Sequence, residues 1–234
     1  MPAQNGQISL ISRDTSVCYG FLFNIMVKIT GLKVQKRNKD RVNVYLDGEF
    51  AFGLSRIVAA WLHTGQELSD EKIAELQAQD NVEVALQRAL NFLSYRPRSE
   101  QEVRQNLKKH KYDQAVIDEI IERLVRGRLV DDENFAELWV ENRSEFRPRG
   151  SRMLRAELRQ KGLSDRVIED ALSDLDETNL ALNAARKRSR RYRDLEQDEF
   201  RKKLYAFLAR RGFHYGVISE VVPIVWEEIS SDPD

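Results

Sequence analysis

The sequence has little of the chemistry that most enzymes and metalloproteins use. Its 234 residues include one cysteine, Cys18, and three histidines that lie far apart in the chain. A lone cysteine cannot form an internal disulfide, and scattered histidines lack the spacing of metal ligands, so we predict neither a disulfide scaffold nor a metal site. A glycine-rich phosphate loop and a His–Glu metal motif are missing too. We therefore expect a protein that needs no cofactor and is not an enzyme.

Long apolar runs and an excess of one charge are missing as well. The apolar run from Tyr19 to Met26 is shorter than a spanning helix, and its upstream flank carries only one positive charge, Arg13. We therefore predict no membrane span and no secretion signal, and we expect a cytoplasmic protein, which suits the lone cysteine. Lys and Arg total 38, and Asp and Glu also total 38, so only the distribution of charge can indicate a partner.

The first residues differ from the rest of the chain. Residues 1–26 show no clear period and are rich in Ser, Asn, Gln and Gly, so we expect a disordered tail there. Met26 directly precedes the first convincing strand, and the tail is interpreted as an extension upstream of a protein that starts at Met26. The alternative is a short docking segment.

Residues 27–80 predict a small β-rich segment with two helices. Apolar and polar residues alternate over 42–46 and again over 50–54, on either side of Asp47-Gly48, a dipeptide that favours type I′ hairpin turns. The run from Val27 to Gln35 predicts a third strand. One helix is expected from about Ser55 to His63, ending at Gly65, and Ser69 is expected to cap the other.

From about residue 81 the pattern is helical and it repeats. Val103 and Leu107 recur 51 residues further on as Leu154 and Leu158, and a further shift of 50 gives Leu204 and Leu208. Breaks at proline and glycine divide each unit into three helices, each with one apolar stripe. We predict three-helix repeats over residues 81–130, 131–178 and 179–234. The predicted fold is thus mainly α, with tandem repeats stacked into a curved rod behind the β-rich segment.

Charge is sorted within the predicted repeats, because the first two helices are basic and the third is acidic. Arg186 to Arg193 is the densest basic run, and such like charges repel one another unless something neutralises them. A neutral chain with one basic flank can bind a polyanion or an acidic protein face, although a solvated helix surface is the alternative. The candidate contacts for a partner or for DNA are Arg96, Arg98, Arg143, Arg147, Arg149, Arg152, Arg155, Arg186, Lys187, Arg188, Arg190, Arg191, Arg193, Lys202 and Lys203.

Aromatic and acidic pairs have simpler structural interpretations. Phe135 and Trp139 are four residues apart on one predicted helix face, which favours core packing. Tyr192 and Tyr205 lie near the basic run and have base stacking as a second possible role. The pair Asp131-Asp132 offers two carboxylates to a magnesium ion, but it precedes a helix, where carboxylates act as caps.

Several motifs of the central stretch follow one another in a definite order. They are Leu93-Ser94-Tyr95-Arg96-Pro97-Arg98-Ser99, then Leu129-Val130-Asp131-Asp132-Glu133-Asn134-Phe135-Ala136, then Lys161-Gly162-Leu163. In this order and spacing, the chain resembles the RecX family of recombinase regulators across residues 95–165, and the third unit follows more loosely. The resemblance implies tandem three-helix repeats and a regulator that binds RecA and its filament on single-stranded DNA. It also implies that strand exchange and ATP hydrolysis are inhibited or limited. We expect a monomer.

Two other classes of protein stay open at this point. A DNA-binding protein that acts on nucleic acid alone is one, since small three-helix units also occur in helix-turn-helix proteins. A metal-dependent nuclease is the weaker one, because the sequence shows no metal-binding constellation. The sequence does not decide between an inhibitor and a stimulator, and it does not say which basic residues contact which partner.

Overall fold

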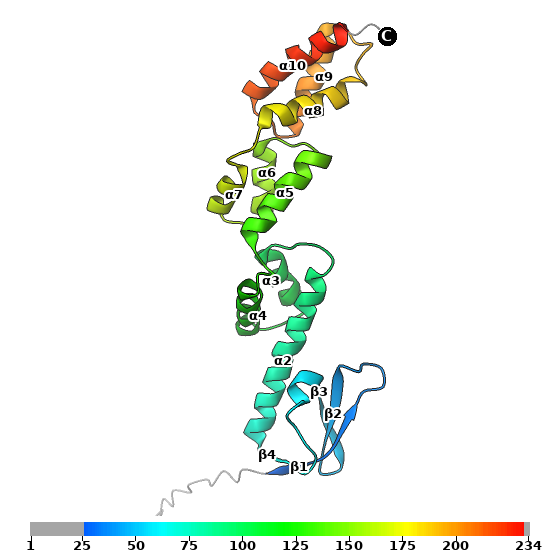
Figure 1. Cartoon of the computed structure of the whole chain (residues 1–234), viewed down its shortest axis with the longest axis vertical. Coiled ribbons are helices and arrows are strands. Elements are labelled where there is room, and N and C mark those ends of the chain that lie inside the picture. The colour runs from blue at the N-terminus through cyan, green and yellow to red at the C-terminus, as the bar shows by residue number, and fades with distance from the viewer. Residues whose placement is uncertain (1–25, 232–234) are drawn as a thin grey trace, which may run out of the picture. The chain divides into compact units, whose positions relative to one another are not determined.

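The computed structural model describes residues 26–231 (Figure 1), so the predicted tail lies outside the described residues except for Met26. The described part is mainly helical, with ten helices and four strands. It divides into two compact units between Ala78 and Gln79. The first unit contains the sheet, and the second contains the helical repeats.

The sheet of the first unit is antiparallel and has the order β3-β2-β1-β4. Its strands are β1 (Val27–Val34), β2 (Arg41–Leu46), β3 (Glu49–Ser55) and β4 (Glu67–Leu68). Asp47 and Gly48 join β2 to β3 with φ of 47° and 95°, the two positive values that a type I′ turn requires, as predicted. One face of the sheet is packed, and Ile29, Val44 and Leu54 are fully buried.

A register shift breaks the predicted alternation of the returning strand. Val44 pairs with Phe52, but Tyr45 pairs with Phe50, so Ala51 is an extra residue in β3. Paired residues point to the same face, and the extra residue therefore moves Phe50 to the side opposite Val44. Phe50 is 58% exposed and makes an edge-to-face contact with Tyr45, which corrects the prediction that it shares a face with Phe52.

After the hairpin, the helix is shorter than predicted, and it is followed by a short strand that was not predicted. Helix α1 spans only Arg56–Ala59, capped by Ser55. Gly65, with φ of 94°, does not end this helix but donates its N–H to the carbonyl oxygen of Ile29 at 2.7 Å, which leads the chain into β4. Helix α2 (Asp70–Leu93) begins after Ser69, whose Oγ accepts from Lys72, and it continues unbroken through residues 80–81, where a boundary was predicted.

The second unit contains three repeats of three helices (Figure 1). Repeat 1 consists of the end of α2, α3 (Glu100–Lys109) and α4 (Gln114–Arg126). Repeat 2 consists of α5 (Asp132–Phe146), α6 (Ser151–Gln160) and α7 (Asp165–Leu172), and repeat 3 of α8 (Glu177–Ser189), α9 (Gln197–Arg210) and α10 (Tyr215–Ser230). Each repeat has its own apolar core. Leu107, Leu158 and Leu208, equivalent positions of the second helices, are all fully buried.

One contact between neighbouring repeats recurs at equivalent positions. Between repeats 1 and 2, the hydroxyl of Ser99 donates to the carbonyl oxygen of Lys161 at 2.7 Å. Between repeats 2 and 3, the N–H of Gly150 donates to the carbonyl oxygen of Arg211 at 3.0 Å. Gly150 and Arg211 hold the repeat positions of Ser99 and Lys161, so each second helix begins against the end of the next one.

The glycines that follow α6 and α9 are required by conformation and by packing together. Gly162 and Gly212 have φ of 87° and 86°. A Cβ at Gly212 would lie 2.5 Å from the Cβ of Met153, and one at Gly162 would lie 2.4 Å from that of Gln101. The equivalent position of repeat 1 is Lys111, which is exposed and has φ of 64°. A left-handed residue can therefore be a lysine, but one pressed against the preceding repeat must be a glycine.

Candidate binding surface

Several basic residues are neutralised by the acidic third helices of their own repeats. Arg155 makes a bidentate pair with Glu169, with Nε and Nη2 donating at 3.0 and 2.8 Å. Arg186 pairs with Glu228 in the same way, at 2.9 and 2.5 Å. The charges that the sequence sorts into different helices thus meet inside a repeat. Arg155 and Arg186, both predicted as partner contacts, already have carboxylate partners.

The side chains of the two arginines beside Pro97 already interact with other side chains of the protein. Nη2 of Arg96 donates to Oε1 of Glu102 at 2.9 Å. The guanidinium of Arg98 lies 4.0 Å from the ring centre of Phe92, and burial together with the charge of Arg96 lowers the pKa of Arg98. Burial alone would raise the pKa of Glu102, but hydrogen bonds from Arg96 and from Lys161 of the next repeat outweigh it and keep this pKa low.

Positive charge accumulates where repeats 2 and 3 meet. We call the five arginines at this place the junction cluster; they are Arg143, Arg147, Arg149, Arg188 and Arg211. Among the described residues, Glu157 is the one carboxylate that pairs with the cluster. It accepts from Nε of Arg143 at 2.9 Å and also pairs with Arg149.

The electrostatics of the junction cluster show that its charge is poorly compensated. Burial lowers the pKa of Arg211, and the positive charges of Arg149, Arg147 and Arg188 lower it further. Burial and the charges of Arg143 and Arg147 lower the pKa of Arg149 in the same way. Arg211 also donates to the carbonyl oxygen of Pro148 at 2.9 Å, so a side chain of repeat 3 contacts the loop that carries Arg147 and Arg149. An anion placed here would relieve the repulsion.

The remaining predicted contacts fall into two groups. The side chains of Lys187, Arg190 and Arg191 are exposed and pair with no other residue in the range 26–231, and Lys202 on α9 is exposed as well. The others have partners: Nη2 of Arg152 donates to the carbonyl oxygen of Ala209 at 3.1 Å, Nε of Arg188 donates to Oη of Tyr192 at 2.9 Å, Lys203 pairs with Glu199 at 2.7 Å, and Arg193 also makes a contact. The basic run is thus only partly free, and Arg188 links it to the junction cluster.

The aromatic side chains pack as structural residues. Phe135 is 4% exposed and stacks on the partly buried Trp139, with ring centres 5.7 Å apart, which confirms the predicted core role. Nε1 of Trp139 donates to Glu157 at 2.8 Å. Tyr192 packs edge-to-face on Phe200, and the hydroxyl of Tyr205 donates to Ser219 at 3.0 Å, so both tyrosines are partly buried against the core of repeat 3.

Asp131 caps α5, as predicted, whereas Asp132 is the first residue of α5 and contacts a helix of the preceding repeat. Asp131 accepts from the N–H of Asn134 at 3.0 Å, and Asp132 accepts from the N–H of Glu100 at 2.8 Å, which places it at the start of α3 in the preceding repeat. Within residues 26–231 there is no group of three or more His, Cys, Asp or Glu side chains that could hold a metal ion. None of the helices described is long and apolar enough to cross a membrane.

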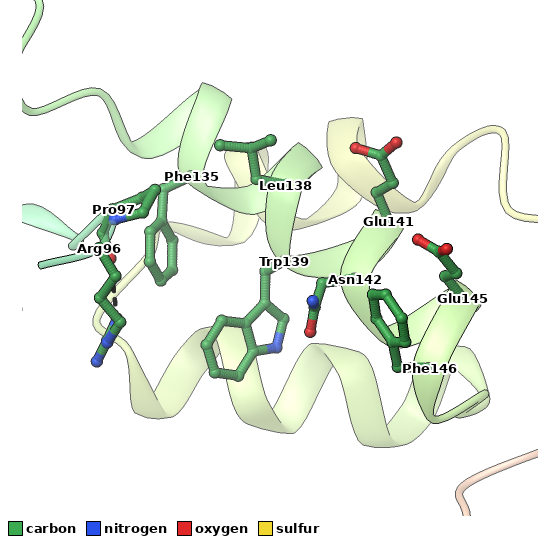
Figure 2. Close-up of a pocket in the computed structure, with 9 residues that line it drawn as sticks. All are labelled: Arg96, Pro97, Phe135, Leu138, Trp139, Glu141, Asn142, Glu145 and Phe146. Carbon is green, nitrogen blue, oxygen red and sulfur yellow. Dashed lines mark hydrogen bonds between the residues drawn. The ribbon is translucent and has the colours of Figure 1, made fainter.

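A groove runs along α5 and reaches the loop before α3 (Figure 2). Its volume is about 510 Å³. The Arg96–Pro97 segment closes the end near Phe135, and Glu141, Glu145 and Phe146 lie toward the other end. The lining residues are Arg96, Pro97, Phe135, Leu138, Trp139, Glu141, Asn142, Glu145 and Phe146. Leu138 is 41% exposed and Phe146 64% exposed, so part of this apolar surface is open to solvent.

Two acidic residues of these networks were not identified from the sequence. Glu157 is the counter-ion of the junction cluster, but its repeat equivalents are Asn106 and Phe207, so no recurring pattern indicates it. Glu102 joins Arg96 to Lys161 across two repeats. Its place three residues after the cap Ser99 indicates a capping box, which the structure contains, but gives no sign of the contact between repeats.

Comparison with protein families defines the class of protein. Residues 27–69 match the regulatory protein RecX N-terminal domain, and residues 85–124, 131–172 and 176–222 match the first, second and third RecX three-helix domains. These domains follow one another as the sheet and the three repeats do. The chain belongs to the RecX family of regulatory proteins.

Individual relatives agree with this assignment. The regulatory protein RecX of Bacillus subtilis (strain 168) is 35% identical over 211 residues, which are 88% of this chain and 80% of the relative. That of Clostridium botulinum (strain Alaska E43 / Type E3) is 35% identical over 204 residues, 84% of this chain and 95% of the relative. A crystal structure of a regulatory protein RecX is similar with a TM-score of 0.67 and 30% identity, covering 88% of this chain and all of that one.

Proposed function

We propose that this protein binds the RecA recombinase and its filament on single-stranded DNA and inhibits the recombinase, so that it limits DNA recombination and repair. The proposal is supported by membership of a family whose members are named regulatory proteins. On this proposal it acts as a binding protein and not as an enzyme. It acts in the cytoplasm, as a monomer and without a cofactor.

The observation that carries the proposal is the junction cluster. Glu157 is the one carboxylate among the described residues that pairs with this cluster, and it pairs with Arg143 and Arg149. The exposed Lys187, Arg190 and Arg191 adjoin the cluster through Arg188. A filament on single-stranded DNA presents a continuous row of phosphates, and an excess of positive charge binds such a row by displacing its counter-ions.

An assay with purified RecA tests the proposal. The protein is added to RecA filaments on single-stranded DNA, and ATP hydrolysis and strand exchange are measured against its molar ratio to RecA. Inhibition at ratios well below one protein per RecA supports the proposed function. Inhibition only when the protein is abundant enough to coat the DNA would instead support the alternative, a DNA-binding protein that acts without RecA.

A further inference from the structure

The first helix of repeat 2 carries an acidic ridge that the protein leaves unpaired. Glu137, Glu141 and Glu145 follow one another at intervals of four residues along α5, and all three are exposed. No described residue forms a hydrogen bond or an ion pair with the carboxylate of any of them. Like charges at this spacing destabilise a helix, and carboxylates near its C-terminal end also oppose its dipole. The three carboxylates therefore lower the stability of the protein in the absence of a partner.

Acidic residues elsewhere in repeat 2 are treated differently. Glu133, on the same helix, pairs with Arg166, and Glu157, Asp165 and Glu169 of α6 and α7 all have arginine partners. Among the described carboxylates of helices α5, α6 and α7, those without a partner thus all lie in the later turns of α5. Arg143 on this helix is two residues from both Glu141 and Glu145 and points away to Glu157, since residues two apart lie on different sides of a helix.

The unpaired carboxylates border the apolar groove of Figure 2. Glu141 and Glu145 line one end of it together with Phe146, while Leu138 and Trp139 line its middle. At the other end, Arg96 is engaged by Glu102 and so is not a free cation. The groove therefore offers exposed apolar surface beside negative charge without a counter-ion. Glu141 and Glu145 would repel a phosphate backbone, whereas they would attract a cationic protein segment.

We propose that the α5 groove binds a protein segment that presents apolar side chains next to Lys or Arg, and that it is the surface through which the chain contacts the protein component of the filament. This inference rests on the proposed function and assigns the protein and the DNA of the filament to two different surfaces. The apolar side chains of the partner pack on Leu138, Trp139 and Phe146, and its cations pair with Glu141 and Glu145. The junction cluster is left to the phosphates of the DNA.

The test compares two charge reversals of equal size. The groove variant carries Glu141→Lys and Glu145→Lys. The control carries Glu220→Lys and Glu227→Lys on α10, where both residues are exposed and their carboxylates have no partner in residues 26–231. Affinity is measured by fluorescence anisotropy for RecA filaments on a labelled oligonucleotide and for the bare oligonucleotide. A third variant, Phe146→Ala, removes apolar surface without changing charge.

Filament binding should weaken about tenfold or more in the groove variant relative to the control, because like charges would then face each other in the interface. Phe146→Ala should weaken filament binding as well. Both charge variants should bind the bare oligonucleotide equally. A groove variant that binds filaments as the control does would overturn the inference and leave the proposed function intact. A wild-type protein that binds filaments no better than bare DNA would refute the proposed function and this inference with it.

Discussion

The division of basic residues into free and paired groups makes a quantitative prediction about DNA binding. One triple variant removes the free cations of the basic run by the changes Lys187→Ala, Arg190→Ala and Arg191→Ala. A matched variant removes three cations that have carboxylate partners, Arg155, Arg159 and Arg186. Both lose the same net charge, so a difference between them reports the position and pairing of the cations and not the total charge.

The expected size follows from counter-ion release. Each phosphate contact on single-stranded DNA contributes roughly 0.7 to the slope of log affinity against log salt, so the loss of three contacts makes the slope shallower by about two units. Removing the paired arginines should change the slope by much less, because their charge is already neutralised within the protein. It should instead lower the melting temperature slightly, because ion pairs are lost, whereas the free triple should leave the melting temperature nearly unchanged.

The measurement is a titration of a labelled single-stranded oligonucleotide by fluorescence anisotropy at several salt concentrations between roughly 50 and 200 mM. Thermal unfolding of the same samples gives the stability. If the paired triple reduces the salt slope as much as the free triple, the ion pairs of the repeats must open on binding. That result would refute the division of the cations into free and paired groups. An unchanged slope in the free triple would move the DNA contact to the junction cluster alone.

Three further predictions concern the packing of the repeats. Leu158→Ala should lower the free energy of unfolding by about 2–5 kcal/mol, because the side chain is fully buried; a loss below about 0.5 kcal/mol in urea denaturation would contradict its place in the core. Gly212→Ala should cost about 1–2 kcal/mol for the left-handed backbone and about 1–3 kcal/mol more for the overlap with Met153, and a stable variant would show that repeats 2 and 3 can move apart. Glu102→Gln should cost about 1.5–3 kcal/mol at neutral pH. The pKa of Glu102 is lowered in the folded protein, so the stabilisation by its carboxylate is present above the unfolded pKa and is lost as the pH falls through the folded value. The stability difference between Glu102→Gln and wild type should therefore shrink in acid. A difference independent of pH would argue against this ion pair.

The sequence by itself determined the helical repeats and the hairpin. The stripe that places Leu107, Leu158 and Leu208 at one repeat position is a local property of each helix, and all three are fully buried in the structure. The turn at Asp47-Gly48 is local too, because positive φ at both residues is a property of the dipeptide. Residues that are close in sequence supply these patterns, so no knowledge of distant contacts is needed to interpret them.

The small elements of the first unit could be identified only from the tertiary structure. Strand β4 is two residues long, which is too short to show an alternation, and it exists because Glu67 and Leu68 pair with β1. The register shift that exposes Phe50 depends on how β2 and β3 pair across the hairpin. Pairing between strands is a contact between distant residues, and an alternating pattern fixes it only where the whole strand is regular.

The binding surface was decided by packing. In the sequence, Arg155 and Arg190 are both members of dense basic segments and appear equivalent. In the structure, α7 brings Glu169 to Arg155, whereas the guanidinium of Arg190 has no carboxylate partner among the described residues. The same packing places Arg188 and Arg211 of repeat 3 near Arg147 and Arg149 of repeat 2, which are far from them in sequence. Composition and periodicity determine which charges a helix carries, but Coulomb energy depends on the distance between charges and on their exposure to water, and both are set only when the helices pack.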